Sequence, residues 1–160
     1  MKKYLVLSLL FISLLCFAQS SNYELMGKEL RVINAVYQSQ YDKNPYIKQI
    51  MDKTMEYRLD PKLGKKEYAT KDEIQGLKDF EELQIGRDKE TIDVYKKFQP
   101  PQYIQMMSDY NNKRKDLRIQ LTNKKITWRQ FSDGLEDLII KNRAKESEYR
   151  DKKVIEPEVT

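Results

Sequence analysis

Apolar side chains recur at three- and four-residue spacings along most of this chain, and runs that strictly alternate apolar with polar residues are hard to find. This spacing is typical of amphipathic helices rather than of strands. The chain also has only 5 Gly and 5 Pro, so helix-breaking positions are few. We therefore expect an all-α protein whose helices are separated by short turns.

Two helices are predicted in the first third of the chain after residue 21. The first covers residues 22–41, with a capping box formed by Ser21 and Glu24. Asn44 can cap the second helix, Pro45 suits its first position, and we expect it to end near residue 59, before Pro61. The expected core stripes are Met26, Leu30, Ile33, Val36, Tyr37 and Tyr41 in the first helix, and Ile47, Ile50, Met51, Met55 and Leu59 in the second.

A long third helix is predicted over residues 71–98, after a loop at residues 60–69. Thr70 and Glu73 form a second capping box, and Pro100 and Pro101 follow the expected end of the helix. Gly86 lies in its interior, so a kink or an early end at this residue stays open. The expected core positions are Ile74, Leu77, Phe80 or Glu81, Ile85, Ile92, Tyr95 and Phe98.

The last third of the chain predicts a helical hairpin. A fourth helix covers residues 102–121 and a turn covers residues 123–125. Thr127 then caps a fifth helix with Gln130 at its third position, while Ile126 and Phe131 can form a hydrophobic staple. Apolar residues thin out after residue 143, and we expect residues 152–160 to be a frayed tail.

The segment from Leu121 to Phe131, with Ile-Thr after a short polar turn, resembles the helix–turn–helix of short bacterial C-terminal (SHOCT-type) modules. It departs from that pattern by lacking Gly in the turn and acidic residues after Thr127. The resemblance implies an antiparallel hairpin and no particular chemistry. The architecture we expect is an antiparallel bundle of four to five helices with coiled-coil-like packing, forming a single domain over residues 19–151.

The first 18 residues differ from the rest of the chain. Lys2 and Lys3 precede an apolar run of about 13 residues, and small residues stand near Ala18, as in a secretory signal peptide. A transmembrane helix needs about 20 apolar residues, so this run is short for a span. Cys16 could carry a lipid anchor, but Leu15 stands where a small residue normally precedes such a cysteine. We expect an exported protein, periplasmic or secreted.

Composition excludes most catalytic chemistry from the part after residue 18. The chain has no His, and its single Cys is Cys16. Histidine-based triads, cysteine nucleophiles, Cys/His zinc sites and disulfides therefore require residues that this part lacks. No stretch fits a calcium loop, and the paired acids Glu81-Glu82 and Glu136-Asp137 diverge on their helices. We expect no enzyme activity, no cofactor and no metal.

Charge and aromatic residues mark one candidate surface. Basic residues dominate residues 102–130, while residues 71–94 are mainly acidic. The basic group is either a docking patch for an acidic partner or the complement of a neighbouring acidic helix. A Tyr- and Met-rich segment lies beside it, and its aromatic rings and flexible thioethers suit either an interface or ordinary packing. The partner-binding candidates are Tyr103, Met106, Met107, Tyr110, Lys113, Arg114, Lys115, Arg118, Lys124, Lys125 and Arg129.

The leading functional hypothesis is a small exported helical protein that binds a macromolecule in the cell envelope or outside the cell. Adaptor, inhibitor and accessory-subunit roles all fit, with a protein or an anionic envelope component as partner. The alternatives are a periplasmic holdase-type chaperone and a helical surface adhesin. Nucleic acid is not expected, because the charge is nearly balanced and a base-reading motif is absent. The oligomeric state stays open.

Overall fold

The computed structural model describes the backbone of residues 2–60, 62–63 and 67–155, and the side chains of residues 22–60, 62–63 and 67–150. It contains five helices and, within these ranges, no strand. The helices are α1 (Lys2–Lys43), α2 (Pro45–Leu59), α3 (Lys71–Phe98), α4 (Pro101–Thr122) and α5 (Trp128–Ile155). The predicted all-α, bundle-like fold is confirmed.

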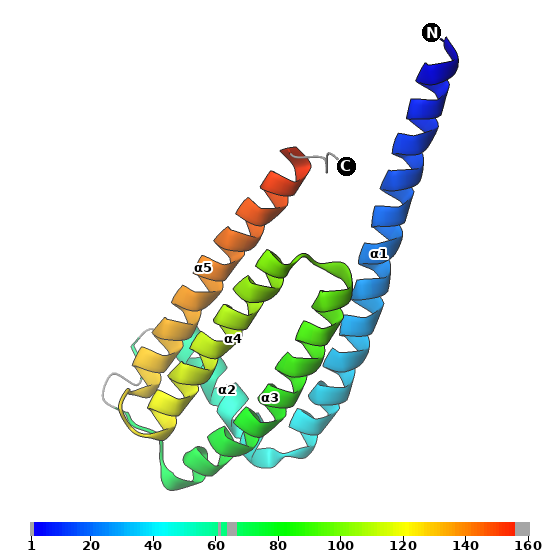
Figure 1. Ribbon diagram of the computed structural model, residues 1–160. Coiled ribbons are helices and arrows are strands. Elements are labelled where there is room, and N and C mark those ends of the chain that lie inside the picture. Colours follow the sequence, from blue (N-terminus) through cyan, green and yellow to red (C-terminus); the bar gives the residue numbers. More distant parts are fainter. Residues whose placement is uncertain (1, 61, 64–66, 156–160) are drawn as a thin grey trace.

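Four long helices lie side by side in the order α1, α3, α4, α5, and neighbours in this row pack against each other (Figure 1). The short helix α2 crosses the row obliquely and packs against α1, α3 and α5. Because α2 has only 15 residues, it spans part of the length of the row. This arrangement leaves room for a groove beside α2.

Local capping signals place most helix ends where the sequence predicts them. Asn44 accepts hydrogen bonds from the amides of Tyr46 and Ile47, and the Thr70–Glu73 capping box forms in full. The helix start predicted at residue 22, with Ser21 as its N-cap, is wrong, because the α1 backbone is helical from Lys2 onward. Helix α5 extends to Ile155, into the segment predicted to be a frayed tail, and residues 156–160 lie outside the described part.

The hydrophobic core has two parts. One is centred on Leu77, Leu121 and Trp128, and the other on Tyr41 and Ile47. Several predicted core residues are instead exposed, since a three-four spacing marks a face of a helix but does not say whether another element covers it. These residues are Val36, Met51, Met55, Leu59 and Ile85.

Two glycines allow close helix contacts. A Cβ on Gly76 would lie 2.9 Å from the carbonyl oxygen of Tyr46, so α2 and α3 approach each other closely there. A Cβ on Gly86 would lie 2.7 Å from the hydroxyl of Tyr37, so this glycine admits a tyrosine from α1. Helix α3 runs through Gly86 without an end, which answers the question that the sequence left open.

The turn between α4 and α5 is a Schellman motif without glycine. The amide of Lys124 donates to the carbonyl of Leu121 at 3.0 Å, and that of Lys125 donates to Gln120 at 2.9 Å. Lys124 therefore adopts a φ of 55°, in the left-handed region. Thr127 and Gln130 then form the predicted capping box, so the helical hairpin is confirmed.

A partly buried ionic network joins α2, α3 and α5 around Lys53. Its ammonium group forms ion pairs with Glu67 and Glu73 and lies 5.1 Å from the centre of the Trp128 ring. Glu73 also accepts hydrogen bonds from the amide of Thr70 at 2.8 Å and from the Trp128 indole at 3.2 Å. We call the side chains of Lys53, Tyr57, Glu67, Glu73 and Trp128 the Lys53 network; in it Tyr57 donates to Glu67.

The pKa values in this network follow from its pairing. Burial opposes the ionisation of Glu73, but hydrogen bonds from Lys53, Thr70 and Trp128 outweigh it and lower the pKa of this carboxyl. Hydrogen bonds from Lys53 and Tyr57 lower the pKa of Glu67. Burial disfavours the charged form of Lys53, yet its two carboxylate partners raise its pKa. Both carboxylates are therefore held in their ionised form at neutral pH.

No helix in the described part of the chain is long and apolar enough to cross a membrane.

Candidate functional site

An apolar groove lies between α2 and α5, with α3 and α4 as its floor. Its volume is about 330 Å³, which is at the lower end of the range for ligand pockets in proteins. Three helices contribute side chains at every fourth position, so each presents one face to the groove. We call this site the α2–α5 groove. Its lining residues are Ile50, Met51, Thr54, Met55, Arg58, Leu77, Phe80, Tyr110, Arg114, Arg118, Phe131, Leu135 and Ile139.

One end of the α2–α5 groove is tied by an ion pair. Arg58 of α2 reaches Glu136 of α5, with its Nη2 atom 2.7 Å from the carboxylate. Met51 and Met55 lie on the same helix and are 37% and 51% exposed, so their thioethers form an open apolar wall. Such unbranched side chains adapt to the shape of an occupant.

Arg114 is the unsatisfied charge in this groove. Its guanidinium is partly buried and lies 5.3 Å from the centre of the Tyr110 ring. Among the residues that the structure describes, no carboxylate lies within ion-pair distance of Arg114 and no acceptor bonds to it. Burial lowers the pKa of Arg114, which the nearby Asp88 carboxylate partly offsets. A charged group that has lost water without gaining a partner favours an incoming anion.

Arg118 lies one turn further along α4 and is paired. Its side chain is buried, forms an ion pair with Glu81 of α3 and lies over the Phe80 ring. This contact joins the basic segment of α4 to the acidic segment of α3. Arg118 therefore belongs to the second alternative given above, in which the basic residues of one helix pair with the acidic residues of its neighbour.

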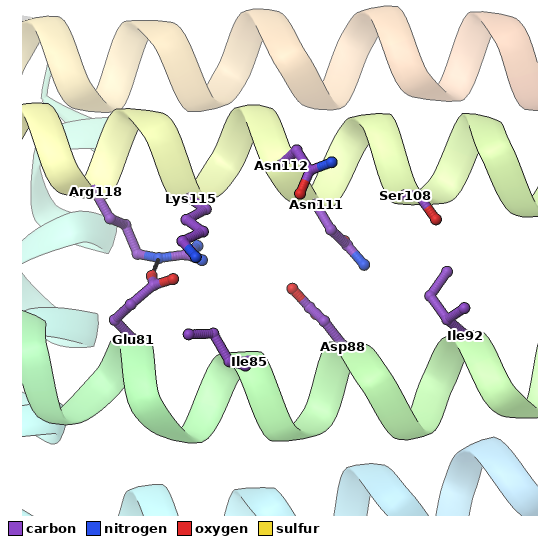
Figure 2. A pocket seen from close by; sticks show the side chains of 9 residues that line it. All are labelled: Glu81, Ile85, Asp88, Ile92, Ser108, Asn111, Asn112, Lys115 and Arg118. Carbon is purple, nitrogen blue, oxygen red and sulfur yellow. Dashed lines mark hydrogen bonds and ion pairs between the residues drawn. The ribbon is translucent and has the colours of Figure 1, made fainter.

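A second, polar cleft lies between α3 and α4 alone (Figure 2). Its volume is about 220 Å³, and Figure 2 shows the Asp88 carboxylate and the Asn111 amide facing each other across it. The Glu81–Arg118 ion pair closes one end. We call this site the α3–α4 cleft. Its lining residues are Glu81, Ile85, Asp88, Ile92, Ser108, Asn111, Asn112, Lys115 and Arg118.

The structure distributes the predicted basic residues over several places instead of one patch. Arg129 is tied down locally, because it donates to the carbonyls of Asp60 and Leu63 and pairs with Asp133 at 3.2 Å. Arg114 and Arg118 line the α2–α5 groove. Four exposed lysines remain: Lys115 borders the α3–α4 cleft, and the others are Lys113, Lys124 and Lys125.

The predicted Tyr- and Met-rich segment is mostly half-buried. Tyr103 packs edge-on against Tyr95 of α3 and contacts Tyr149 of α5, so it joins three helices. Met106 and Met107 are both partly buried, and neither faces fully outward. Of this segment only Tyr110 lines the α2–α5 groove.

Sequence reasoning missed most of the groove wall. Met51 and Met55 were expected in the core, and Leu135 and Ile139 in the apolar stripe of the fifth helix, but that these faces meet Arg58 at one groove depends on distant contacts. One signal was available: Met51 lies next to Ile50, so the apolar face of α2 is wider than a single contact needs. Such a face predicts a second contact, although not its partner.

The two sites present different chemical groups. Within the described residues, no group of three or more Asp, Glu, His or Cys residues is arranged to hold a metal ion. The α2–α5 groove offers apolar surface beside an unpaired cation, and the α3–α4 cleft offers carboxylate, amide and hydroxyl groups. No family model matches the chain, and no curated protein or solved structure matches it either.

Proposed function

We propose that this chain is an exported, non-catalytic binding protein of the cell envelope or the extracellular space. Its α2–α5 groove holds an apolar segment of a partner protein, and an acidic side chain of that segment pairs with Arg114. The observation that carries this proposal is the partly buried Arg114 guanidinium, which has no carboxylate partner at the edge of an apolar groove. The proposal on export rests on the signal-like first 18 residues.

The energetics favour an anionic group at Arg114. Hydrogen bonds to charged groups contribute about 1.5–3 kcal/mol, and the contribution is larger where water is already excluded. The guanidinium also lies over the Tyr110 ring, and its N–H donors can form two parallel hydrogen bonds with a carboxylate. An arginine beside an aromatic ring is a frequent centre of binding energy at protein interfaces.

The apolar wall supports a protein partner. Met51 and Met55 belong to one face of α2 and are exposed. Leu135 and Ile139 continue the apolar surface on α5. Helical partners bind such grooves with side chains spaced by three or four residues. The groove residues recur at a similar spacing of four residues.

The test is site-specific photo-crosslinking in the host organism. A benzophenone amino acid replaces Met55 in the full chain, in otherwise native sequence and in an Arg114→Glu background. Lys113→Glu is the matched control, because Lys113 is exposed, next to Arg114 in sequence and outside the groove. We expect one protein to crosslink at Met55, to persist in the Lys113→Glu background, and to decrease at least tenfold with Arg114→Glu.

Two other results would contradict the proposal. Equal crosslinking in the Arg114→Glu and Lys113→Glu backgrounds would show that Arg114 does not take part in binding. A broad set of unrelated unfolded proteins would instead favour the holdase-type chaperone. Fractionation of the same cells tests export, since the crosslinked protein is expected outside the cytoplasm.

A further inference from the structure

We propose that the α3–α4 cleft is a second binding site, and that it binds a linear aliphatic diamine or polyamine through two ammonium groups. This site shares no apolar wall with the α2–α5 groove, and α2 contributes no residue to it. The same chemistry is present in a lysine side chain with a free amino terminus, so the test below separates free amines from lysine peptides.

The first observation is an unpaired oxygen of Glu81. Its Oε2 atom accepts from Arg118, but its Oε1 atom is buried and has no hydrogen-bond partner. It is the only buried side-chain N or O atom of this kind among the described residues. Native proteins leave few such atoms unpaired, and each one calls for a donor that binds there. Glu81 lines the α3–α4 cleft, so a ligand in the cleft can supply that donor.

The second observation is the order of residues along α3. Glu81, Ile85 and Asp88 lie on one face at the spacing of successive turns, and Figure 2 shows all three lining the cleft. Seven residues separate the two carboxyl-bearing residues, or roughly 10 Å along the helix axis. Ile85 lies between them and is 49% exposed. An aliphatic chain with an ammonium group at each end matches this sequence of anion, apolar surface and anion.

The α4 side of the cleft completes this site with neutral groups. Figure 2 shows Asn111 facing Asp88 and Ser108 lying opposite Ile92, further along the cleft; the amide and hydroxyl oxygens of these residues can accept hydrogen bonds from an ammonium group. Gln84 donates to one oxygen of Asp88 at 2.7 Å, which positions this carboxylate. Three cations oppose the ligand: Arg118 is already paired with Glu81, Lys115 is exposed at the rim, and Arg114 lies near Asp88. Lys115 competes with a bound ammonium group, so its removal should strengthen binding.

The experiment is isothermal titration calorimetry of the full chain with linear diamines, from propane-1,3-diamine to decane-1,10-diamine. Pentylamine, which has one ammonium group, is the control ligand. Two-point binding predicts one site per chain, an affinity maximum at an intermediate chain length, and at least tenfold weaker binding of pentylamine. A steady rise of affinity with length, or equal affinity for pentylamine, would overturn the proposal.

Three variants locate the site. Asp88→Asn should weaken the best diamine about tenfold, while Asp93→Asn on the exposed side of the same helix should leave it unchanged. Lys115→Ala should strengthen binding a few-fold, and weaker binding there would overturn the diammonium assignment. Tri-lysine binding more tightly than every diamine would assign the site to a peptide instead of a free amine. Thermal unfolding of each variant checks its fold. An unfolded Asp88→Asn is replaced by Ile85→Lys, whose ammonium group repels a diammonium ligand and should abolish its binding.

Discussion

The Lys53 network and the α2–α5 groove each contain a long basic side chain beside an aromatic ring. They differ in whether that basic group has a carboxylate partner. Lys53 lies over Tyr57 and Trp128 and is paired with two carboxylates. Arg114 lies over Tyr110 and is paired with none in the described structure. The two cations also differ in position, because Lys53 joins three helices while Arg114 faces the groove between two of them.

This difference separates a structural charge from a binding charge. Partners for Lys53 come from the loop before α3 and from α3 itself, so the pair is complete once the chain folds. Arg114 is already partly dehydrated and still lacks an anion. Removing a paired charge should therefore cost stability, and removing Arg114 should cost binding. The predictions below test that distinction in order of expected effect.

The largest effect is expected from Glu73→Ala. This substitution leaves Lys53 with one exposed partner and leaves the Trp128 indole without an acceptor. Breaking a buried ion pair on one side lowers the free energy of unfolding by about 3–5 kcal/mol. Urea unfolding monitored by tryptophan fluorescence measures this free energy, because Trp128 is the only tryptophan. Glu82→Ala on the exposed side of α3 should change stability by less than about 0.5 kcal/mol.

The second effect compares two arginines of α4. Arg118→Met leaves Glu81 partly buried without its partner and should lower the free energy of unfolding by about 3 kcal/mol. Arg114→Met removes a cation that has no ion pair, so stability should stay within about 0.5 kcal/mol or increase. Urea titrations of both variants measure the difference. Equal losses would show that Arg114 is a structural residue.

The third effect is a loss of stability in acid that depends on the Lys53 network. Glu67 and Glu73 have pKa values below the ordinary value of 4.5 in the folded chain. Their contribution is thus fully present above pH 4.5 and is lost as the pH falls through the lower folded-state values. We expect the free energy of unfolding to fall over this range, and to fall less steeply in Glu73→Ala. Parallel pH profiles of the two proteins would contradict this origin.

The smallest effect concerns the turn between α4 and α5. Lys124 has a φ of 55°, in the left-handed region. This conformation is higher in free energy for a residue with a Cβ atom than for glycine. Lys124→Gly should raise the free energy of unfolding by about 0.5–1 kcal/mol. Lys125→Gly is the matched control, since the φ of Lys125 is not positive, and it should be neutral or destabilising. Both values follow from thermal or urea unfolding.

Local signals in the sequence predicted most of the fold. Thr70 with Glu73, and Thr127 with Gln130, are capping contacts between residues three apart, so they can be identified without tertiary information. The start and end of α3 were predicted to the residue. The start of α1 was wrong because the Ser21–Glu24 pattern fits a cap but does not prevent a helix from continuing.

The candidate sites could not be predicted fully, because they depend on contacts between helices that the spacing of apolar residues does not specify. Glu81 and Arg118 are 37 positions apart, and only their pairing shows that Arg118 is occupied while Arg114 is not. The sequence did place both arginines and Tyr110 among the binding candidates. It placed Met55 in the core, because the spacing that marks a buried stripe also marks the wall of an open groove.

The central claim is that Arg114 serves binding and not folding. The most direct test measures both properties on Arg114→Met: unfolding in urea, and photo-crosslinking from Met55 in the host. The account predicts wild-type or higher stability together with at least a tenfold loss of the crosslinked partner. A loss of stability as large as that of Arg118→Met, with crosslinking reduced only in proportion to the unfolded fraction, would contradict it.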